Sequence, residues 1–283
     1  MVSVVHSVAA QGDDPQFPRL LADGLDARES GRLATALDFA RETYATANLG
    51  SGEGIWSHAR GMALIIAGLK LDADSRVAAL LFALPACDEH ATENLEARFG
   101  ADVTRLVRGM SGLNRLRPIT HGFVAVDKSG GKNAQETRAQ VEVLRKMLLA
   151  MVEDIRVVLL RLASRTQTLR HYAAHPDDLR IEVARETLEL YSPLANRLGV
   201  WELKWELEDL SFRFLHPDTY KKIAKMLDET RLEREQFIAA AIERVKRELA
   251  ELGIAAEVYG RPKHIYSIWN KMRKKNLEFT DVY

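Results

Sequence analysis

The stretch IAAEVYGRPKHIYSIWNKM, residues 254–272, marks a change in the character of the chain. Before it, apolar residues recur at a spacing of three to four, which is the period of a helix. Within it, Ile254–Tyr259 is a short apolar run that ends at Gly260 and predicts a β-strand. Pro262 suits the first position of a helix that follows. The sequence therefore predicts a mainly α protein in which an all-helical region leads into the first strand and helix of an α/β unit.

The region before Gly253 predicts a series of long helices. Leu33, Leu37 and Ala40, for example, fall on one helical face, as a buried stripe requires. The expected helices cover about 30–48, 55–70, 73–84, 101–112, 134–171, 178–198, 201–215 and 229–252. We expect an all-helical domain over residues 1–225, a helical connector over 226–252 and the start of a second domain over 253–283. Because one strand and one helix cannot enclose a core, we expect the chain to be a truncated portion of a longer protein.

The composition is that of a globular protein without a strong charge bias. Hydrophobic residues make up 47% of the 283 residues, and 40 Lys and Arg balance 40 Asp and Glu. A zero net charge gives no general attraction to nucleic acid or to a membrane surface. The one cysteine, Cys87, can form no internal disulfide and is expected to be a packed thiol, which fits a reducing compartment. Because no signal segment or membrane-spanning run is evident, a cytoplasmic location is expected.

The predicted helix after Pro262 combines an apolar face with a basic one. The apolar residues follow the i, i+3, i+4, i+7 pattern of a stripe that faces a core: Ile265, Ile268, Trp269 and Met272. The polar residues at its entrance and on the opposite face, spaced four apart from position 263 onward, are Arg261, Lys263, Ser267 and Lys271.

A basic helix start of this kind favours an anion. The free N–H groups and the positive dipole end of a helix suit phosphate, and an arginine fork with two lysines can grip a triphosphate. The alternative is an ordinary amphipathic helix whose basic face is solvated. A nucleic-acid-binding helix is a third reading, although Trp269 lies on the apolar face and is not available to stack on bases.

Several stretches carry a resemblance to a known family. They are residues 260–269 (GRPKHIYSIW), 189–199 (ELYSPLANRLG), 204–212 (KWELEDLSF), 145–151 (RKMLLAM) and 154–158 (DIRVV). These stretches resemble the RelA/SpoT family and occur in the same order as in that family. The similarity extends over about residues 30–283. The resemblance implies an HD-type hydrolase domain followed by the start of a (p)ppGpp synthetase domain with an α/β nucleotidyltransferase-like fold.

The resemblance implies a part in guanosine tetraphosphate biosynthesis during the stringent response. The family's GTP pyrophosphokinases transfer pyrophosphate from ATP to the 3′-hydroxyl of GTP or GDP, with Mg²⁺ as the cofactor. Arg261, Lys263, Ser267 and Lys271 match positions on the nucleotide-phosphate side of the synthetase site. The family's Mg²⁺-binding aspartate falls just after Tyr283, so we expect no catalytic residue in this chain and no activity from it alone. The ribosome and uncharged tRNA are implied partners of the longer protein, through C-terminal domains outside this chain.

The HD-type domain of the family holds Mn²⁺ through histidines and acids. The resemblance places the first of these ligands at His58, at the end of the segment 51–58. The remaining ligand positions are changed to Phe82, Ala83, Ala86, Cys87 and Ser164, and the first three of these cannot coordinate a metal ion. Gln167 and Thr168 stand where the family has a His-Asn pair. Because a hard divalent ion needs several such ligands, we expect no Mn²⁺, an inactive hydrolase domain with a regulatory role, and a His58 that is hydrogen-bonded within the fold.

Other interpretations stay open. The chain could be a non-catalytic regulatory or nucleotide-binding module, or an HD-type metal-dependent (p)ppGpp phosphohydrolase with a rearranged metal site. His171 and His175 have the spacing of two metal ligands on a helix, but Pro176 ends that helix and no third ligand is evident. We therefore expect this histidine pair to lie at the surface.

Overall fold

The computed structural model describes residues 16–87, 91–115, 154–229, 231–260 and 263–282, and these residues form helices and connecting loops without a strand. The chain divides into two compact units, Met1–Leu207 (unit 1) and Glu208–Tyr283 (unit 2). The boundary falls inside one helix, α13 (Trp201–Leu215). The predicted domain limits at 225 and 252 concern the domains of a longer protein, and they stay predictions.

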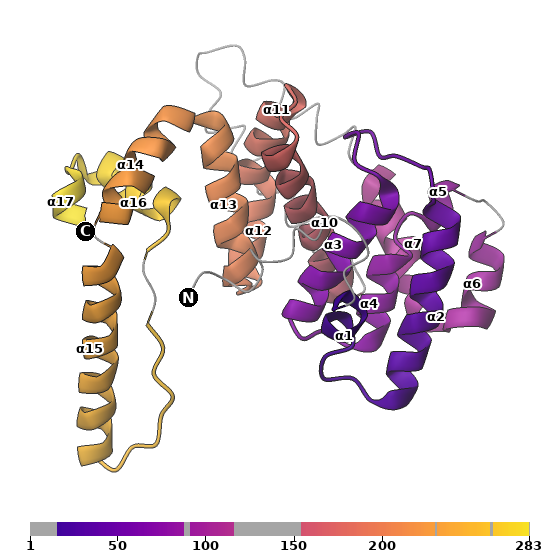
Figure 1. Ribbon diagram of the computed structural model, residues 1–283, viewed down its shortest axis with the longest axis horizontal. Helices are drawn as coiled ribbons and strands as arrows, with labels where there is room; N and C mark the ends of the chain where they lie inside the picture. Colours follow the sequence, from indigo (N-terminus) through magenta and orange to yellow (C-terminus); the bar gives the residue numbers. More distant parts are fainter. Residues whose placement is uncertain (1–15, 88–90, 116–153, 230, 261–262, 283) are drawn as a thin grey trace. The chain divides into compact units, whose positions relative to one another are not determined.

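The helices of unit 1 confirm most of the predicted ones (Figure 1). They are α1 (Phe17–Leu21), α2 (Ala27–Tyr44), α3 (Ile55–Gly68), α4 (Ala73–Leu80), α5 (Leu84–Cys87), α6 (Ala91–Phe99), α7 (Ala101–Arg115), α10 (Ile155–Ala174), α11 (Leu179–Glu186), the π-helical turn η3 (Thr187–Tyr191), α12 (Ser192–Arg197) and the first half of α13. The predicted helix 178–198 is thus continuous but changes its winding at η3. Most of the predicted segment 134–171 that precedes α10 lies outside the described residues.

Acidic side chains cap the N-terminal ends of several of these helices. Asp26 accepts a hydrogen bond from Glu29 N at 2.8 Å while the Glu29 carboxylate accepts one from Asp26 N, which makes a complete capping box for α2. Asp72 caps α4 by accepting from Ser75 N at 2.8 Å. Asp154 caps α10 by accepting from Arg156 N at 2.9 Å. The sequence thus fixes where these helices start by satisfying N–H groups that have no partner inside the helix.

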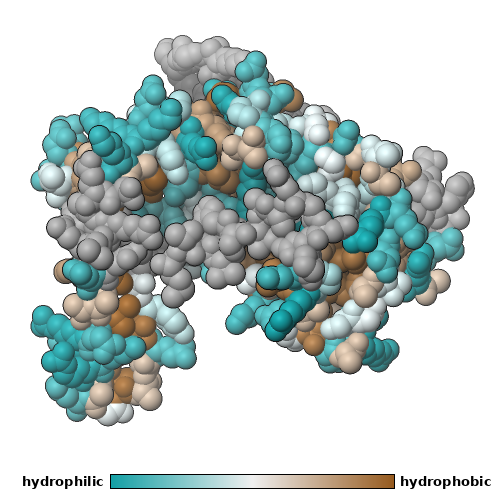
Figure 2. Space-filling model, in the orientation of Figure 1, coloured by the Kyte–Doolittle hydropathy of each residue, from teal (hydrophilic) through white to brown (hydrophobic). Residues whose placement is uncertain are grey.

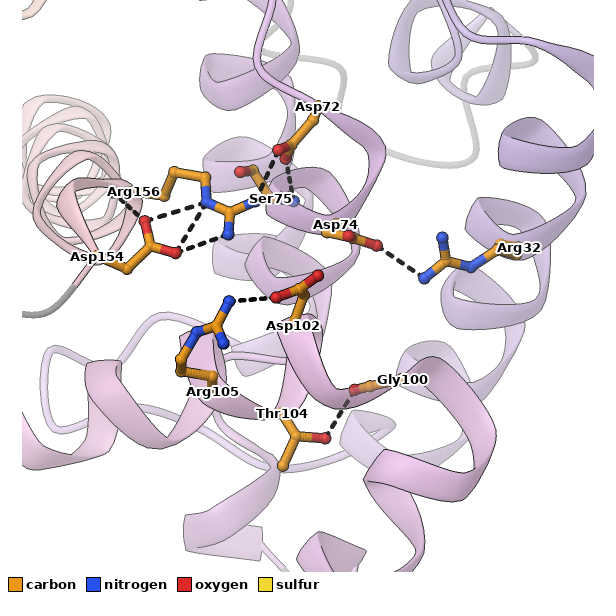
Figure 3. Close-up of polar contacts among 10 residues, drawn as sticks. All are labelled: Arg32, Asp72, Asp74, Ser75, Gly100, Asp102, Thr104, Arg105, Asp154 and Arg156. Carbon is orange, nitrogen blue, oxygen red and sulfur yellow. Dashed lines mark hydrogen bonds and ion pairs between the residues drawn. The ribbon is translucent and has the colours of Figure 1, made fainter.

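Ion pairs connect these capped ends (Figure 3). Arg156 reaches Asp154 at 2.6 Å and Asp72 at 2.7 Å, and so joins the start of α10 to the start of α4. Hydrogen bonds from Arg156 lower the pKa of Asp154. Burial acts to raise the pKa of Asp72, but hydrogen bonds from Ser75 and the charge of Arg156 outweigh it and lower that pKa. Both carboxylates are therefore held in the charged form by the fold.

The core of unit 1 surrounds α4. This helix is buried on nearly every side and packs against α2, α3 and α7, while α3 packs against α10. Gly109 lets α7 approach α10, because a Cβ at this position would lie 2.8 Å from a methyl of Val157. Burial on nearly every side explains why the second half of α4, Val77–Leu80, is small and aliphatic. The charged side chain of Arg76 is buried in the same helix, and it donates to the backbone carbonyls of Leu21 and Asp23.

Unit 2 contains the rest of α13 and the helices α14 (Pro217–Glu229), α15 (Arg231–Glu251), α16 (Ile265–Lys275) and α17 (Phe279–Val282). Its core consists of the buried side chains Phe212, Ile223, Leu227, Ile268, Phe279 and Val282. The four apolar residues of the predicted stripe pack there, and the rings of Phe212 and Trp269 are 4.6 Å apart. The apolar face of the predicted helix is therefore confirmed, although α16 begins at Ile265 rather than at Pro262, which lies outside the described residues.

The predicted strand Ile254–Tyr259 is wrong. These residues form no strand, and no strand is present elsewhere in the described parts of the chain to pair with them. The segment instead runs back along α15, and a Cβ at Gly260 would lie 2.8 Å from Ile238 (Figure 1). An extended apolar segment becomes a strand only when a partner supplies ladder hydrogen bonds.

The α15 arm, defined as α15 with residues 252–260, is the most exposed part of unit 2. Phe237 is 75% exposed and Leu252 is 73% exposed, and Figure 2 shows apolar surface on this arm at the lower left. The prediction of a long surface helix after residue 229 is confirmed, since α15 runs without interruption to Glu251.

Candidate functional site

His58 is the centre of a buried polar cluster in unit 1. It lies on the first turn of α3, is 1% exposed, and its Nδ1 is 2.7 Å from Glu53 Oε2. Its Nε2 is 2.9 Å from the Oγ of Ser164, which lies on α10. The imidazole thus uses both ring nitrogens within the protein, as expected for His58, and it connects α3 to α10.

A fourth residue, Gln167, completes the cluster. Its Nε2 donates to Glu53 Oε1 at 2.7 Å, so both carboxylate oxygens of Glu53 are bonded. Gly61, one turn after His58, provides the room, because a Cβ at Gly61 would lie 2.1 Å from Gln167 Oε1. We call Glu53, His58, Ser164 and Gln167 the polar cluster.

The loop before α3 sets the position of Glu53. Leu49 N donates to Glu53 O at 2.8 Å, and Gly52 N donates to Leu49 O at 2.9 Å. Gly52 has a φ of +80°, a conformation that glycine adopts without strain. This tight turn directs the Glu53 side chain inward, where it is 3% exposed. Glu53 lies within the segment 51–58, in which the sequence predicted a role only for His58.

Apolar groups close the other side of His58. The ring of Phe82 lies 5.1 Å from the imidazole, and the neighbouring Ala83 N donates to Tyr44 Oη at 3.2 Å. Burial strongly raises the pKa of Tyr44, so its hydroxyl stays protonated. Ala86 and Cys87 are exposed, so the expectation that Cys87 is a packed thiol is wrong. Phe82 therefore lies beside His58, Ala83 is buried and bonded to Tyr44, and Ala86 lies at the surface.

The residues around His58 do not fit a hydrolytic Mn²⁺ ion. Such an ion needs several convergent carboxylate or imidazole ligands. Within the described ranges, no three His, Cys, Asp or Glu side chains lie close enough together to hold a metal. The two groups of suitable chemistry, Glu53 and His58, are bonded to each other. The arrangement joins the two core helices α3 and α10 through hydrogen bonds.

A second buried polar group lies further along α10. Arg165 forms an ion pair with Glu186 at 2.6 Å, and its guanidinium lies 4.2 Å from the centre of the Tyr191 ring. Burial acts to lower the pKa of Arg165, but Tyr191 and Glu186 outweigh it and raise that pKa. This contact joins α10 to the π-helical turn η3, which forms part of the stretch 189–199. These residues hold the fold together rather than line a surface site.

The basic residues of the predicted phosphate site are partly brought together in unit 2. Lys263 lies just before α16, and its Nζ donates to Val282 O at 3.4 Å. Burial and the nearby charge of Lys271 lower the pKa of Lys263, so the two ammonium groups are close enough to repel. Ser267 lies between them on α16 and is half-buried. Arg261 lies outside the described residues.

The start of α16 is capped by a residue that the sequence analysis missed. Asp209 Oδ1 accepts a hydrogen bond from Tyr266 N at 2.9 Å, and its Oδ2 is 3.2 Å from His264 Nδ1. Asp209 belongs to α13, and nothing in the sequence between the two segments indicates that they meet.

The histidines 171 and 175, predicted at the surface, lie at the end of α10 in unit 1. Their ring centroids are 4.8 Å apart and the rings are stacked, and His175 is exposed.

Comparison with known proteins agrees with this architecture. Residues 36–201 match the family described as HD domain. The chain is 43% identical over 224 residues to the GTP pyrophosphokinase of Escherichia coli (strain K12), which is 78% of this chain and 29% of that protein. It is 41% identical over 243 residues to the guanosine-3′,5′-bis(diphosphate) 3′-pyrophosphohydrolase of Haemophilus influenzae, covering 86% of this chain and 34% of that protein.

A third relative combines the two activities in its name. The chain is 38% identical over 251 residues to the bifunctional (p)ppGpp synthase/hydrolase SpoT of Escherichia coli (strain K12), covering 89% of this chain and 34% of that protein. The chain thus spans about a third of the length of these relatives.

The helical bundle with its polar cluster is an HD domain, and the chain belongs to the HD-domain family. In sequence its HD region is similar to the RelA/SpoT proteins reported above, one named a GTP pyrophosphokinase and one a bifunctional (p)ppGpp synthase/hydrolase. In the described part of the chain, no helix is both long and apolar enough to cross a bilayer.

Proposed function

We propose that this chain is the N-terminal part of a GTP pyrophosphokinase, a cytoplasmic enzyme that transfers pyrophosphate from ATP to the 3′-hydroxyl of GTP or GDP with Mg²⁺. In this proposal the HD region has lost hydrolysis and restrains the synthetase. The observation that supports it most is the polar cluster, in which Glu53 and His58 satisfy each other and Ser164 and Gln167 occupy the remaining bonding positions. Phosphoryl transfer would then depend on groups that position and neutralise phosphates.

The helix α16 supports the synthetase half of the proposal. Lys263 and Lys271 repel each other, so an anion between them would remove an unfavourable interaction as well as add a favourable one. With Ser267 and Arg261 they are the proposed ATP-phosphate contacts, and the Mg²⁺-binding aspartate is proposed to follow Tyr283. The ribosome and uncharged tRNA are proposed partners of the longer protein.

Two assays test this proposal. The 283-residue chain should release no pyrophosphate from ppGpp in the presence of Mn²⁺, and equilibrium dialysis should show no stoichiometric Mn²⁺ uptake. A protein extended past Tyr283 should form (p)ppGpp from ATP and GTP with Mg²⁺. A folded extended protein that forms none would contradict the synthetase assignment.

A second candidate function is a (p)ppGpp phosphohydrolase with a rearranged metal site. It is favoured by the identities of 41% and 38% to relatives whose names include hydrolase activity. It requires ligands beyond Glu53 and His58, and the Mn²⁺-dependent assay decides between the two, since measurable hydrolysis that His58→Ala abolishes would establish the phosphohydrolase. A regulatory module without catalysis would show neither activity in the extended protein.

A further inference from the structure

The start of α16 depends on a carboxylate from another helix. His264 occupies the N-cap position but makes no side-chain cap bond. The acceptor for the first turn is instead Asp209 of α13, which takes the Tyr266 N–H with one oxygen and lies 3.2 Å from the His264 ring with the other. Asp209 therefore holds two positions of the chain, on either side of the first residue of α16.

These two contacts restrict the residue that precedes them. Lys263 is the immediate neighbour of His264, and it lies where its Nζ reaches Val282 O and where the charge of Lys271 disfavours it. The bonds of Asp209 to His264 and Tyr266 fix the backbone next to Lys263, and Val282 O holds its Nζ. The tether from Asp209 thus limits where Lys263 can place its ammonium group.

We infer that Asp209 is a positioning residue for the anion-binding face of α16, holding Lys263 in place at the start of the helix. This inference rests on the proposed function, in which that face takes the phosphates of a nucleoside triphosphate. Asp209 itself touches no phosphate, and it acts through the start of the helix.

The hydrogen bonds and the charge of Asp209 have opposite effects on an anion. The bonds order the start of α16, while the negative charge repels an incoming phosphate and competes for the positive end of the helix. The two effects separate in the variant Asp209→Asn, whose amide oxygen still accepts from Tyr266 N but carries no charge. Asp209→Ala removes both.

The test is the binding of inorganic triphosphate to the 283-residue chain, measured by isothermal titration calorimetry. Asp209→Ala should bind at least about fivefold more weakly than the wild type, the size expected from losing a helix cap. Asp209→Asn should bind as tightly as the wild type or more tightly. Asp218→Asn removes the same charge from an exposed site at the start of α14 and should change the affinity by less than about twofold.

Hydrogen exchange of the Tyr266 amide shows whether the cap remains in each variant. Protection should be lost in Asp209→Ala and kept in Asp209→Asn. Equal affinities of wild type and Asp209→Ala overturn the inference, and so does tighter binding by both variants, which would make the carboxylate only a competitor. If Asp209→Ala does not fold, a fivefold loss in an Asp209→Asn protein that keeps its Tyr266 protection overturns it. A wild-type chain that binds no triphosphate refutes the proposed phosphate role of α16 itself, a result distinct from all of these.

Discussion

The helices α3 and α16 both bring polar side chains to a packed surface, but they satisfy them in opposite ways. On α3, His58 has a partner on each ring nitrogen, and all of these partners come from unit 1. On and before α16, Lys271 and Lys263 are brought together although their charges repel. The first arrangement uses its polar atoms within the fold, whereas the second places two like charges near each other. A buried histidine next to an acid is thus not sufficient to indicate a metal site, because each group can satisfy the other.

The largest effect on stability is expected at the buried ion pair of unit 1, between Arg165 and Glu186. Glu186→Gln leaves the buried Arg165 without its counter-charge and should lower the free energy of unfolding by about 3–5 kcal/mol. Urea unfolding with hydrogen exchange of α10 amides reports on unit 1 separately from unit 2. Glu182→Gln, an exposed site on the same helix, is the matched control and should cost less than about 0.5 kcal/mol. Equal costs in the two variants would show that the pair does not stabilise unit 1.

A smaller effect on stability is expected where Gln167 packs against Gly61. Gly61→Ala should displace the Gln167 amide from Glu53 and lower the free energy of unfolding by about 1–2 kcal/mol, the loss of a hydrogen bond to a charged group less the helix propensity gained. Gly31→Ala, in α2 with open space around an added Cβ, should be neutral or stabilising. In the double variant with Gln167→Ala, the two costs should sum to less than their separate values. If the two costs in free energy of unfolding are strictly additive, Gly61 and Gln167 do not act through one shared contact.

The next largest effect on stability is expected from lowering the pH, which protonates the aspartates that cap α4 and α10. The pKa values of Asp72 and Asp154 are lowered in the folded state, so their contribution is present at neutral pH and is lost as the pH falls from about 4, their ordinary range, through the folded values. We expect a loss on the order of 1 kcal/mol in urea unfolding between pH 7 and pH 3, since these pairs are partly exposed. Asp72→Asn keeps a capping side chain but should show a weaker pH dependence. An unchanged dependence would exclude Asp72 as a contributor.

The smallest effect is expected on α16. Lys271→Met removes the charge that disfavours Lys263 and should raise the pKa of Lys263, measured by NMR titration of its side chain. The free energy of unfolding should change by less than about 0.5 kcal/mol. Lys275→Met, at the exposed end of the same helix, should leave the Lys263 titration unchanged. If both variants act alike, the two lysines are not specifically paired.

The periodicity of the sequence predicted most of the fold because buried stripes follow the helix period. Residues such as Leu33 and Leu37 of α2, or Ile268 and Trp269 of α16, lie where their spacing places them. The short helices α1, α5, α6 and α17 were missed, because one to three turns carry too few residues to show a period. The helix α14 (Pro217–Glu229) was missed as well, although its 13 residues are enough to show one. The strand at Ile254–Tyr259 was wrong because composition indicates an extended apolar segment but not the partner it needs.

The candidate sites were likewise predicted only in part from the sequence. The resemblance placed His58 and Ser164, and the structure brings them within hydrogen-bond distance. The roles of Glu53 and Asp209 could not be predicted, since each depends on a contact between segments far apart in the sequence. One local signal was available: Gly61 interrupts an otherwise good helix-forming stretch, and a glycine in such a place indicates close packing against a neighbour.

The close fit of Gln167 over Gly61 also has a consequence for the history of this chain. An acid introduced at position 164 alone would face the Glu53 carboxylate across a single imidazole, and an enlarged side chain at position 61 would evict the amide beside it. A larger residue at position 61 is therefore tolerable only together with a smaller one at position 167. The two positions are expected to vary as a pair among related sequences, as neighbours in one packed contact do.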